Sequence, residues 1–122
     1  FNNTQKELYS MSLEQINHNS NLIKADMSFK EFTEKSWKLP EEYYGNRYSV
    51  MVHGIGLCDE WPSIRYPTDG GDKSGRFLKN MTITVESYIG KVGGKEGVKL
   101  EQQYLVGENG LELMSHHPLE NI

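Results

Sequence analysis

The pattern of hydrophobic and polar positions divides the chain into two parts. Over residues 1–47, apolar side chains recur every three or four positions, which is the period of an amphipathic helix. From residue 48 to about residue 115, the pattern becomes that of strands and loops, with two stretches of clean alternation. Helices followed by strands predict an α+β fold.

Two capping-box sequences predict where the helices begin, since each has a hydroxyl residue followed three positions later by glutamate. The first covers residues 4–7 and precedes a helical face formed by Leu8, Tyr9, Leu13 and Ile16. We expect the polar residues 18–21 to weaken or end this helix. The second box covers residues 28–31, and its helix should carry Phe29, Phe32 and Trp37 on one face. Pro40 should close this second helix and can begin another short one.

The second part of the chain predicts a small set of strands. Residues 66–76 are rich in glycine and aspartate and indicate a loop. The glycine-rich residues 90–97 predict a hairpin connection between the two strands that alternate most clearly. The predicted strands are residues 48–52, 81–89, 98–106 and 111–114.

The predicted hairpin brings two acidic residues together. If Gly93 and Gly94 form its tip, Glu86 lies directly opposite Glu101, on the polar face of the hairpin. Like charges in this position destabilise a sheet. Two interpretations are open: both glutamates are solvated on an open face with Lys99 softening the repulsion, or a cation binds between them.

His53 is the candidate nitrogen ligand for such a cation, because it directly follows the first predicted strand. One imidazole with carboxylates suits iron, manganese, cobalt or zinc better than a metal that selects thiolates. A lone histidine beside a glycine-rich turn is more often structural, so His53 by itself does not establish a metal site. His53, Glu86 and Glu101 together would still make an incomplete site for two metal ions.

Composition narrows the class of protein. The 122 residues fit one domain, and 36% hydrophobic with 25% charged residues allow a core of modest size. A net charge of −4 without a basic stripe argues against nucleic acid as a partner, and no apolar run approaches the roughly 18 residues of a membrane span. The single cysteine, Cys58, cannot form an internal disulfide, which fits a cytoplasmic protein. Because the chain opens on Phe1 and soon enters a helix, we expect it to be part of a longer protein.

Three segments resemble a known family: HGIGL at residues 53–57, MTITVE at residues 81–86 and VKLEQQYLV at residues 98–106. They are similar to the C-terminal half of the pita-bread fold shared by creatinase, aminopeptidase P, prolidase and methionine aminopeptidase. The resemblance runs from about residue 1 to residue 113. It implies that residues 1–122 are a partial catalytic domain, with a helical segment 1–47 and a metal-site segment 48–122, of a homodimeric enzyme.

The same resemblance implies roles for three residues. In the metal-dependent members, the matching histidine and two glutamates bind a pair of divalent metal ions together with aspartates. Carried over, His53, Glu86 and Glu101 are metal ligands. The aspartates would lie upstream of this chain, so we expect the isolated segment to bind metal weakly and to be inactive.

One departure from the peptidase pattern points to a particular branch. The peptidases usually carry HGxGLxxHExP, whereas this chain reads HGIGLCDEWP, which resembles the DddP-type dimethylsulfoniopropionate (DMSP) lyases. That branch cleaves DMSP, usually with iron, to dimethyl sulfide and acrylate. The resemblance implies that Asp59 is the catalytic base and that Tyr48 contacts the substrate. Aromatic faces such as Tyr48 and Trp61 also attract cations, and a sulfonium qualifies.

Other functions are compatible with parts of the pattern. A peptidase or a creatinase-like hydrolase on the same fold is the first alternative, and a metal-free binding module is the second. Asp59 could instead cap a turn, and Glu60 has the character of a structural acid. We expect Cys58 to be a small buried residue, and His18, His116 and His117 to lie on the surface.

Overall fold

Over its described residues, 1–57 and 60–119, the computed structural model contains three helices followed by five strands. The helices are α1 (Asn3–Leu22), α2 (Phe29–Lys35) and α3 (Glu41–Tyr44). The strands are β1 (Val50–Gly54), β2 (Ser63–Arg65), β3 (Thr82–Gly90), β4 (Gly97–Val106) and β5 (Leu111–Leu113). This order confirms the predicted α+β class. None of the described helices is long and apolar enough to cross a membrane.

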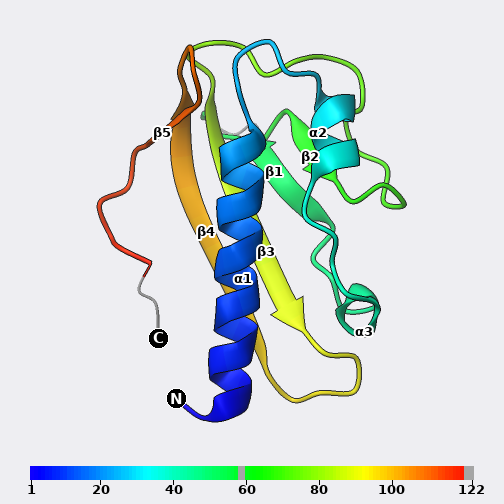
Figure 1. Cartoon of the computed structure of the whole chain (residues 1–122). Coiled ribbons are helices and arrows are strands. Elements are labelled where there is room, and N and C mark those ends of the chain that lie inside the picture. The colour runs from blue at the N-terminus through cyan, green and yellow to red at the C-terminus, as the bar shows by residue number, and fades with distance from the viewer. Residues whose placement is uncertain (58–59, 120–122) are drawn as a thin grey trace.

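The described strands form one antiparallel sheet in the order β2-β1-β3-β4-β5. Helix α1 packs along β3 and β4, and α2 and α3 lie beside the β1–β2 side of the sheet (Figure 1). The two longest strands therefore form the centre of the domain, with one face against α1.

The core lies between α1, α2 and the sheet. Phe77 contacts Phe29 and Phe32 edge-on, with ring centroids 5.0 and 5.8 Å apart. Burying a side chain of this size contributes about 1.5–3 kcal/mol, so these rings are among the main stabilising groups. The fully buried aliphatic residues of the core include Ile16, Ile23, Met51, Val52, Ile64, Ile83, Val85 and Val106.

Helix α1 begins two residues earlier than predicted and ends later. Asn2 forms the cap: its side chain accepts a hydrogen bond from the Gln5 backbone at 2.8 Å, and the Gln5 side chain accepts one from the Asn2 backbone at 3.0 Å. Asparagine caps as well as threonine does, and glutamine can complete the box. The predicted start at residues 4–7 was therefore wrong.

The polar residues 18–21 do not end α1, and two of them make contacts with residues at and just after the end of α2. Asn19 is fully buried, and its side-chain oxygen accepts a hydrogen bond from the Trp37 backbone at 2.8 Å. His18, which is exposed as predicted, has Nε2 3.0 Å from the carbonyl oxygen of Lys35. An asparagine used in this way no longer competes with the helix backbone.

Helix α2 is shorter than predicted. The Ser28 side chain caps it by accepting a hydrogen bond from the Glu31 backbone at 3.0 Å, as the sequence indicated. The helix ends at Lys35, because Ser36 is extended and its hydroxyl donates to the Thr33 carbonyl at 2.9 Å. Trp37 therefore lies outside α2, contrary to the prediction. The short helix after Pro40 is confirmed as α3.

The hairpin register is confirmed: Glu86 in β3 pairs with Glu101 in β4. Strand β2 was not predicted, because three residues are too short to show alternation. It is held by pairing with β1 and by Asp72, whose carboxylate accepts a hydrogen bond from the Ser63 backbone at 2.7 Å. Residues 66–76 form a loop, as predicted.

Candidate metal centre

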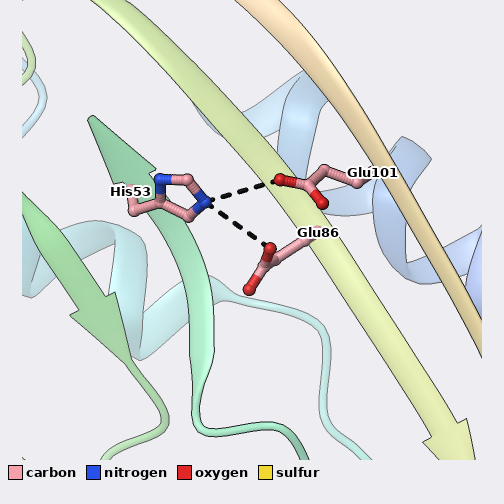
Figure 2. Close-up of side chains that lie close together, drawn as sticks. All are labelled: His53, Glu86 and Glu101. Carbon is pink, nitrogen blue, oxygen red and sulfur yellow. Dashed lines mark ion pairs between the residues drawn. The ribbon is translucent and has the colours of Figure 1, made fainter. Parts of the chain in front are cut away.

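Three adjacent strands bring the predicted ligands together. His53 lies in β1 opposite Thr84 of β3, and Glu86, two residues further along β3, lies opposite Glu101 of β4. Side chains two positions apart on a strand share a face, so all three ligands project from the same side of the sheet. Figure 2 shows both carboxylates turned toward the imidazole.

The distances are those of a compact cluster. His53 Nε2 is 3.6 Å from Glu86 Oε2 and 3.5 Å from Glu101 Oε1 (Figure 2). One candidate ligand atom from each residue can be chosen such that all lie within 4.8 Å of one another. In the other described residues, no second group of three His, Cys, Asp or Glu side chains has this geometry.

The imidazole is held in an orientation suited to a ligand. Its Nδ1 lies 2.9 Å from the Gly54 carbonyl oxygen. A carbonyl oxygen can only accept, so Nδ1 is the donor in this contact and Nε2 of the neutral ring keeps its lone pair. Metal-ligating histidines commonly donate their other ring nitrogen in this way.

Glu86 is the most constrained member of the cluster. Its side chain is 2% exposed, and its Oε1 has no hydrogen-bond partner among residues 1–57 and 60–119. Burial raises the pKa of Glu86, and Glu101 raises it further, while Lys99 and His53 lower it and offset part of the effect. Of the two open interpretations, the one in which both glutamates are solvated does not hold for Glu86, although the Glu101 side chain is 43% exposed.

A divalent cation fits this arrangement. A buried carboxylate oxygen without a partner costs free energy that a ligand can recover. One imidazole nitrogen and two carboxylates form a donor set for iron, manganese, cobalt or zinc. His53, Glu86 and Glu101 are the residues that would hold it.

Lys99 and Tyr48 border the cluster. Lys99 Nζ is 3.6 Å from Glu86 Oε2 and 3.8 Å from Glu101 Oε2, and it lies 4.5 Å from the centre of the Tyr48 ring. The sequence suggested Lys99 as a neighbour of the glutamates. The signal was its position two residues before Glu101, which puts both side chains on one face of β4. The sequence did not indicate the contact between Lys99 and Tyr48.

The segment that follows His53 returns close to β1. The Gly54 backbone N–H lies 3.2 Å from the Glu60 carbonyl oxygen and 2.8 Å from that of Pro62. A Cβ at Gly54 would lie 1.8 Å from the Trp61 carbonyl oxygen. Only glycine allows this approach, a requirement that the HGIGL motif alone did not explain.

The remaining predicted site residues are only partly placed. The Trp61 ring packs edge-on against Phe29, with centroids 6.4 Å apart, and is 56% exposed. Its role in substrate contact stays a prediction, as does that of Tyr48. Asp59, the predicted base, and Cys58 lie outside the described residues. His116 and His117 are exposed, as expected.

A buried polar network supports β3 from the opposite face. Ser87 donates to the side-chain oxygen of Gln15 at 2.6 Å, and the Gln15 amide donates to the Tyr66 hydroxyl at 2.5 Å. Burial raises the pKa of Tyr66, which keeps its hydroxyl protonated. These bonds tie α1 to the strand that carries Glu86. The sequence gives no signal for these bonds, because Gln15 has the character of an ordinary polar position of α1.

The fold is of the pita-bread type, and the cluster is its candidate metal site. The chain belongs to metallopeptidase family M24, whose model matches residues 1–108.

Similar proteins include both lyases and peptidases. The chain is 35% identical over 109 residues to the dimethylsulfoniopropionate lyase DddP of Roseovarius nubinhibens, covering 88% of this chain and 24% of that protein. It is 33% identical over 119 residues to the Xaa-Pro dipeptidase of Pyrococcus furiosus, covering 93% and 32%. The crystal structure of X-Pro aminopeptidase from Thermotoga maritima matches with a TM-score of 0.76 and 26% identity, covering 98% and 33%. The chain thus spans about a quarter of the length of the lyases that it matches.

Proposed function

We propose that this chain is the metal-site part of the catalytic domain of a longer DMSP lyase, which cleaves DMSP to dimethyl sulfide and acrylate. The observation that carries the metal dependence is the convergence of His53 and Glu101 on the buried carboxylate of Glu86. The choice of substrate is supported by the similarity to the dimethylsulfoniopropionate lyase of Roseovarius nubinhibens and by the segment HGIGLCDEWP.

The proposed site holds two divalent metal ions, and iron is our choice among the metals that suit this donor set. Aspartates elsewhere in the longer protein would complete the ligands. Metal held there would supply Lewis acidity, which would make the proton on the carbon next to the substrate carboxylate more acidic.

In this proposal Asp59 acts as the base. Its carboxylate accepts the proton from the carbon next to the substrate carboxylate. The electrons of that C–H bond form the carbon–carbon double bond of acrylate, and the C–S bond breaks with its electron pair remaining on sulfur. The leaving group is therefore neutral dimethyl sulfide. The aromatic faces of Tyr48 and Trp61 would attract the positively charged sulfonium before the reaction.

The substitution Asp59→Ala in the full-length protein tests the base. We expect the rate of dimethyl sulfide formation from DMSP to fall by roughly a hundredfold or more, while the metal content stays close to that of the wild type. Gas chromatography measures the product, and elemental analysis measures the metal. Glu60→Ala is the matched control, because it removes the adjacent acid, and it should retain most of the activity.

Two results would contradict the proposal at different points. Activity that survives Asp59→Ala would show that another group is the base. No dimethyl sulfide from the wild type, with iron or manganese supplied, would exclude the lyase function itself.

Hydrolysis of Xaa-Pro dipeptides is the second candidate, favoured by the similarity to the Xaa-Pro dipeptidase of Pyrococcus furiosus. The chain lacks the second histidine of the HGxGLxxHExP pattern, which argues for the lyase. Assaying the same preparation with proline dipeptides and with DMSP separates the two. Metal-free full-length protein that takes up no metal would favour a binding module.

We also propose that the full-length protein is cytoplasmic, which fits the single cysteine of this chain, and that it is a homodimer, as the resemblance implies. Light scattering of the purified protein would test the dimer.

A further inference from the structure

Lys99 lies between the two glutamates that stand opposite each other in the hairpin. Its Nζ is within 4 Å of a carboxylate oxygen on each, 3.6 Å from Glu86 and 3.8 Å from Glu101. Lys99 pairs with Tyr88, and this pair lies two residues along the strands from the pair of Glu86 and Glu101. Side chains two positions apart on a strand share a face, so Lys99 projects on the same side as the glutamates. A single ammonium group thus contacts both acids.

The metal-free site needs such a cation. Glu86 is buried and faces the like charge of Glu101, an arrangement that destabilises a sheet unless it is compensated. In the described part of the chain, the cationic side chains within ion-pair distance of Glu86 are His53 and Lys99. The Lys99 ammonium approaches a carboxylate oxygen of both glutamates.

The contacts of Lys99 also conflict with a metal ion. The ammonium approaches Glu86 Oε2, which is the oxygen nearest to His53 Nε2. A cation held by His53 and Glu86 would use the same oxygen and would repel the ammonium. Lys99 and the metal therefore compete for one carboxylate.

Tyr48 offers Lys99 a second favourable contact. The Tyr48 ring is 46% exposed, and the ammonium lies 4.5 Å from its centre. An aromatic face attracts a cation independently of the carboxylates. Lys99 therefore has a favourable contact in the metal-free protein that does not depend on the glutamates.

We propose that Lys99 is a tethered counter-ion, which neutralises Glu86 and Glu101 in the metal-free protein and is displaced from them when metal binds. The competition rests on the proposed metal site. Lys99 would then lower the affinity of the site for metal while stabilising the protein before metal is loaded.

Titration calorimetry with Mn²⁺ on the metal-free full-length protein tests the competition. Lys99→Met keeps an unbranched side chain and removes the charge, so we expect Mn²⁺ to bind about fivefold more tightly, a modest gain because the ammonium is half exposed. Lys95→Met removes an exposed lysine from the tip of the same hairpin and should leave the affinity unchanged.

A double-mutant cycle tests the counter-ion role without any metal. In the metal-free protein, Lys99→Met should lower the midpoint of urea unfolding when Glu86 is present and should lower it much less together with Glu86→Gln. Additive effects of the two substitutions would overturn this role.

The outcomes separate the two proposals. Equal or weaker Mn²⁺ binding by Lys99→Met, with binding by the wild type, would overturn the competition and leave the metal site intact. A wild-type protein that binds no Mn²⁺ would overturn both the metal site and the competition.

Discussion

Two clusters of charged side chains differ in whether the protein itself satisfies them. Arg47 and Asp69 form a two-pronged pair, with Nε to Oδ2 at 2.7 Å and Nη2 to Oδ1 at 2.5 Å. Arg47 also donates to the Tyr44 carbonyl at 2.7 Å and lies over the Tyr44 ring. At the other cluster, Glu86 is more deeply buried and keeps one oxygen without a described partner.

The two carboxylates respond in opposite directions. The hydrogen bond from Arg47 lowers the pKa of Asp69, whereas burial raises the pKa of Glu86. A structural ion pair has its donors in place when the chain folds. In a binding site, a buried polar group has a partner only when the ligand is bound. A buried acid with a perturbed pKa is therefore a candidate for a functional role.

Replacing one acid in each cluster should give the largest difference between the two clusters, measured as bound metal and as DMSP cleavage. In the full-length protein, Glu86→Gln should reduce bound metal and DMSP cleavage by on the order of a hundredfold or more, since changes even to the outer partners of metal ligands cost 10- to 100-fold. Asp69→Asn should leave both nearly unchanged. Elemental analysis and dimethyl sulfide release measure the effects. Full metal content in Glu86→Gln would mean that Glu86 is not a ligand.

The sequence predicted the relative positions of the candidate ligands better than the burial of Glu86. Alternation in the two strands and Gly93-Gly94 between them determine the pairing of Glu86 with Glu101, because side chains on a strand have a strict period of two. Burial of Glu86 depends on how distant segments pack, and no local pattern reports it.

The errors in the helical part have a related cause. Asn19 looks like a residue that ends a helix, yet a hydrogen bond from Trp37, 18 positions away, accommodates it. The contact between Lys99 and Tyr48 likewise joins residues from different parts of the sequence. The role of Asp59 was inferred from resemblance and remains a prediction.

Gly54→Ala should have the next largest effect, and it should act on the cluster of His53, Glu86 and Glu101 and not on the pair of Arg47 and Asp69. The added Cβ would lie 1.8 Å from the Trp61 carbonyl oxygen, so the backbone after His53 must move. We expect a loss of about 3 kcal/mol in the free energy of unfolding, measured by urea denaturation of the full-length protein, together with weaker metal binding.

Gly56→Ala is the matched control in the same segment, because a Cβ there meets no atom of residues 1–57 or 60–119 within 4 Å. It should change stability far less. Equal effects of the two substitutions would show that the close approach at Gly54 does not determine the local structure.

The pH dependence of stability should show the smallest effect, and it contrasts Glu86 with Asp69 directly. Because the pKa of Glu86 is raised above 4.5, its contribution to the stability of the metal-free protein is present below pH 4.5 and is lost as pH rises through the folded-state pKa. Because the pKa of Asp69 is lowered below 3.8, its contribution is present above that pH and is lost as pH falls through the folded-state pKa.

Glu86→Gln should therefore stabilise the metal-free protein at neutral pH, by on the order of 1 kcal/mol, and this gain should vanish toward pH 4. Asp69→Asn should destabilise it at neutral pH, with a loss that shrinks only below pH 3.8. Urea unfolding of both variants from pH 3 to 8 measures the two windows, and effects of the same sign at neutral pH would refute the contrast between a satisfied ion pair and an unsatisfied ligand.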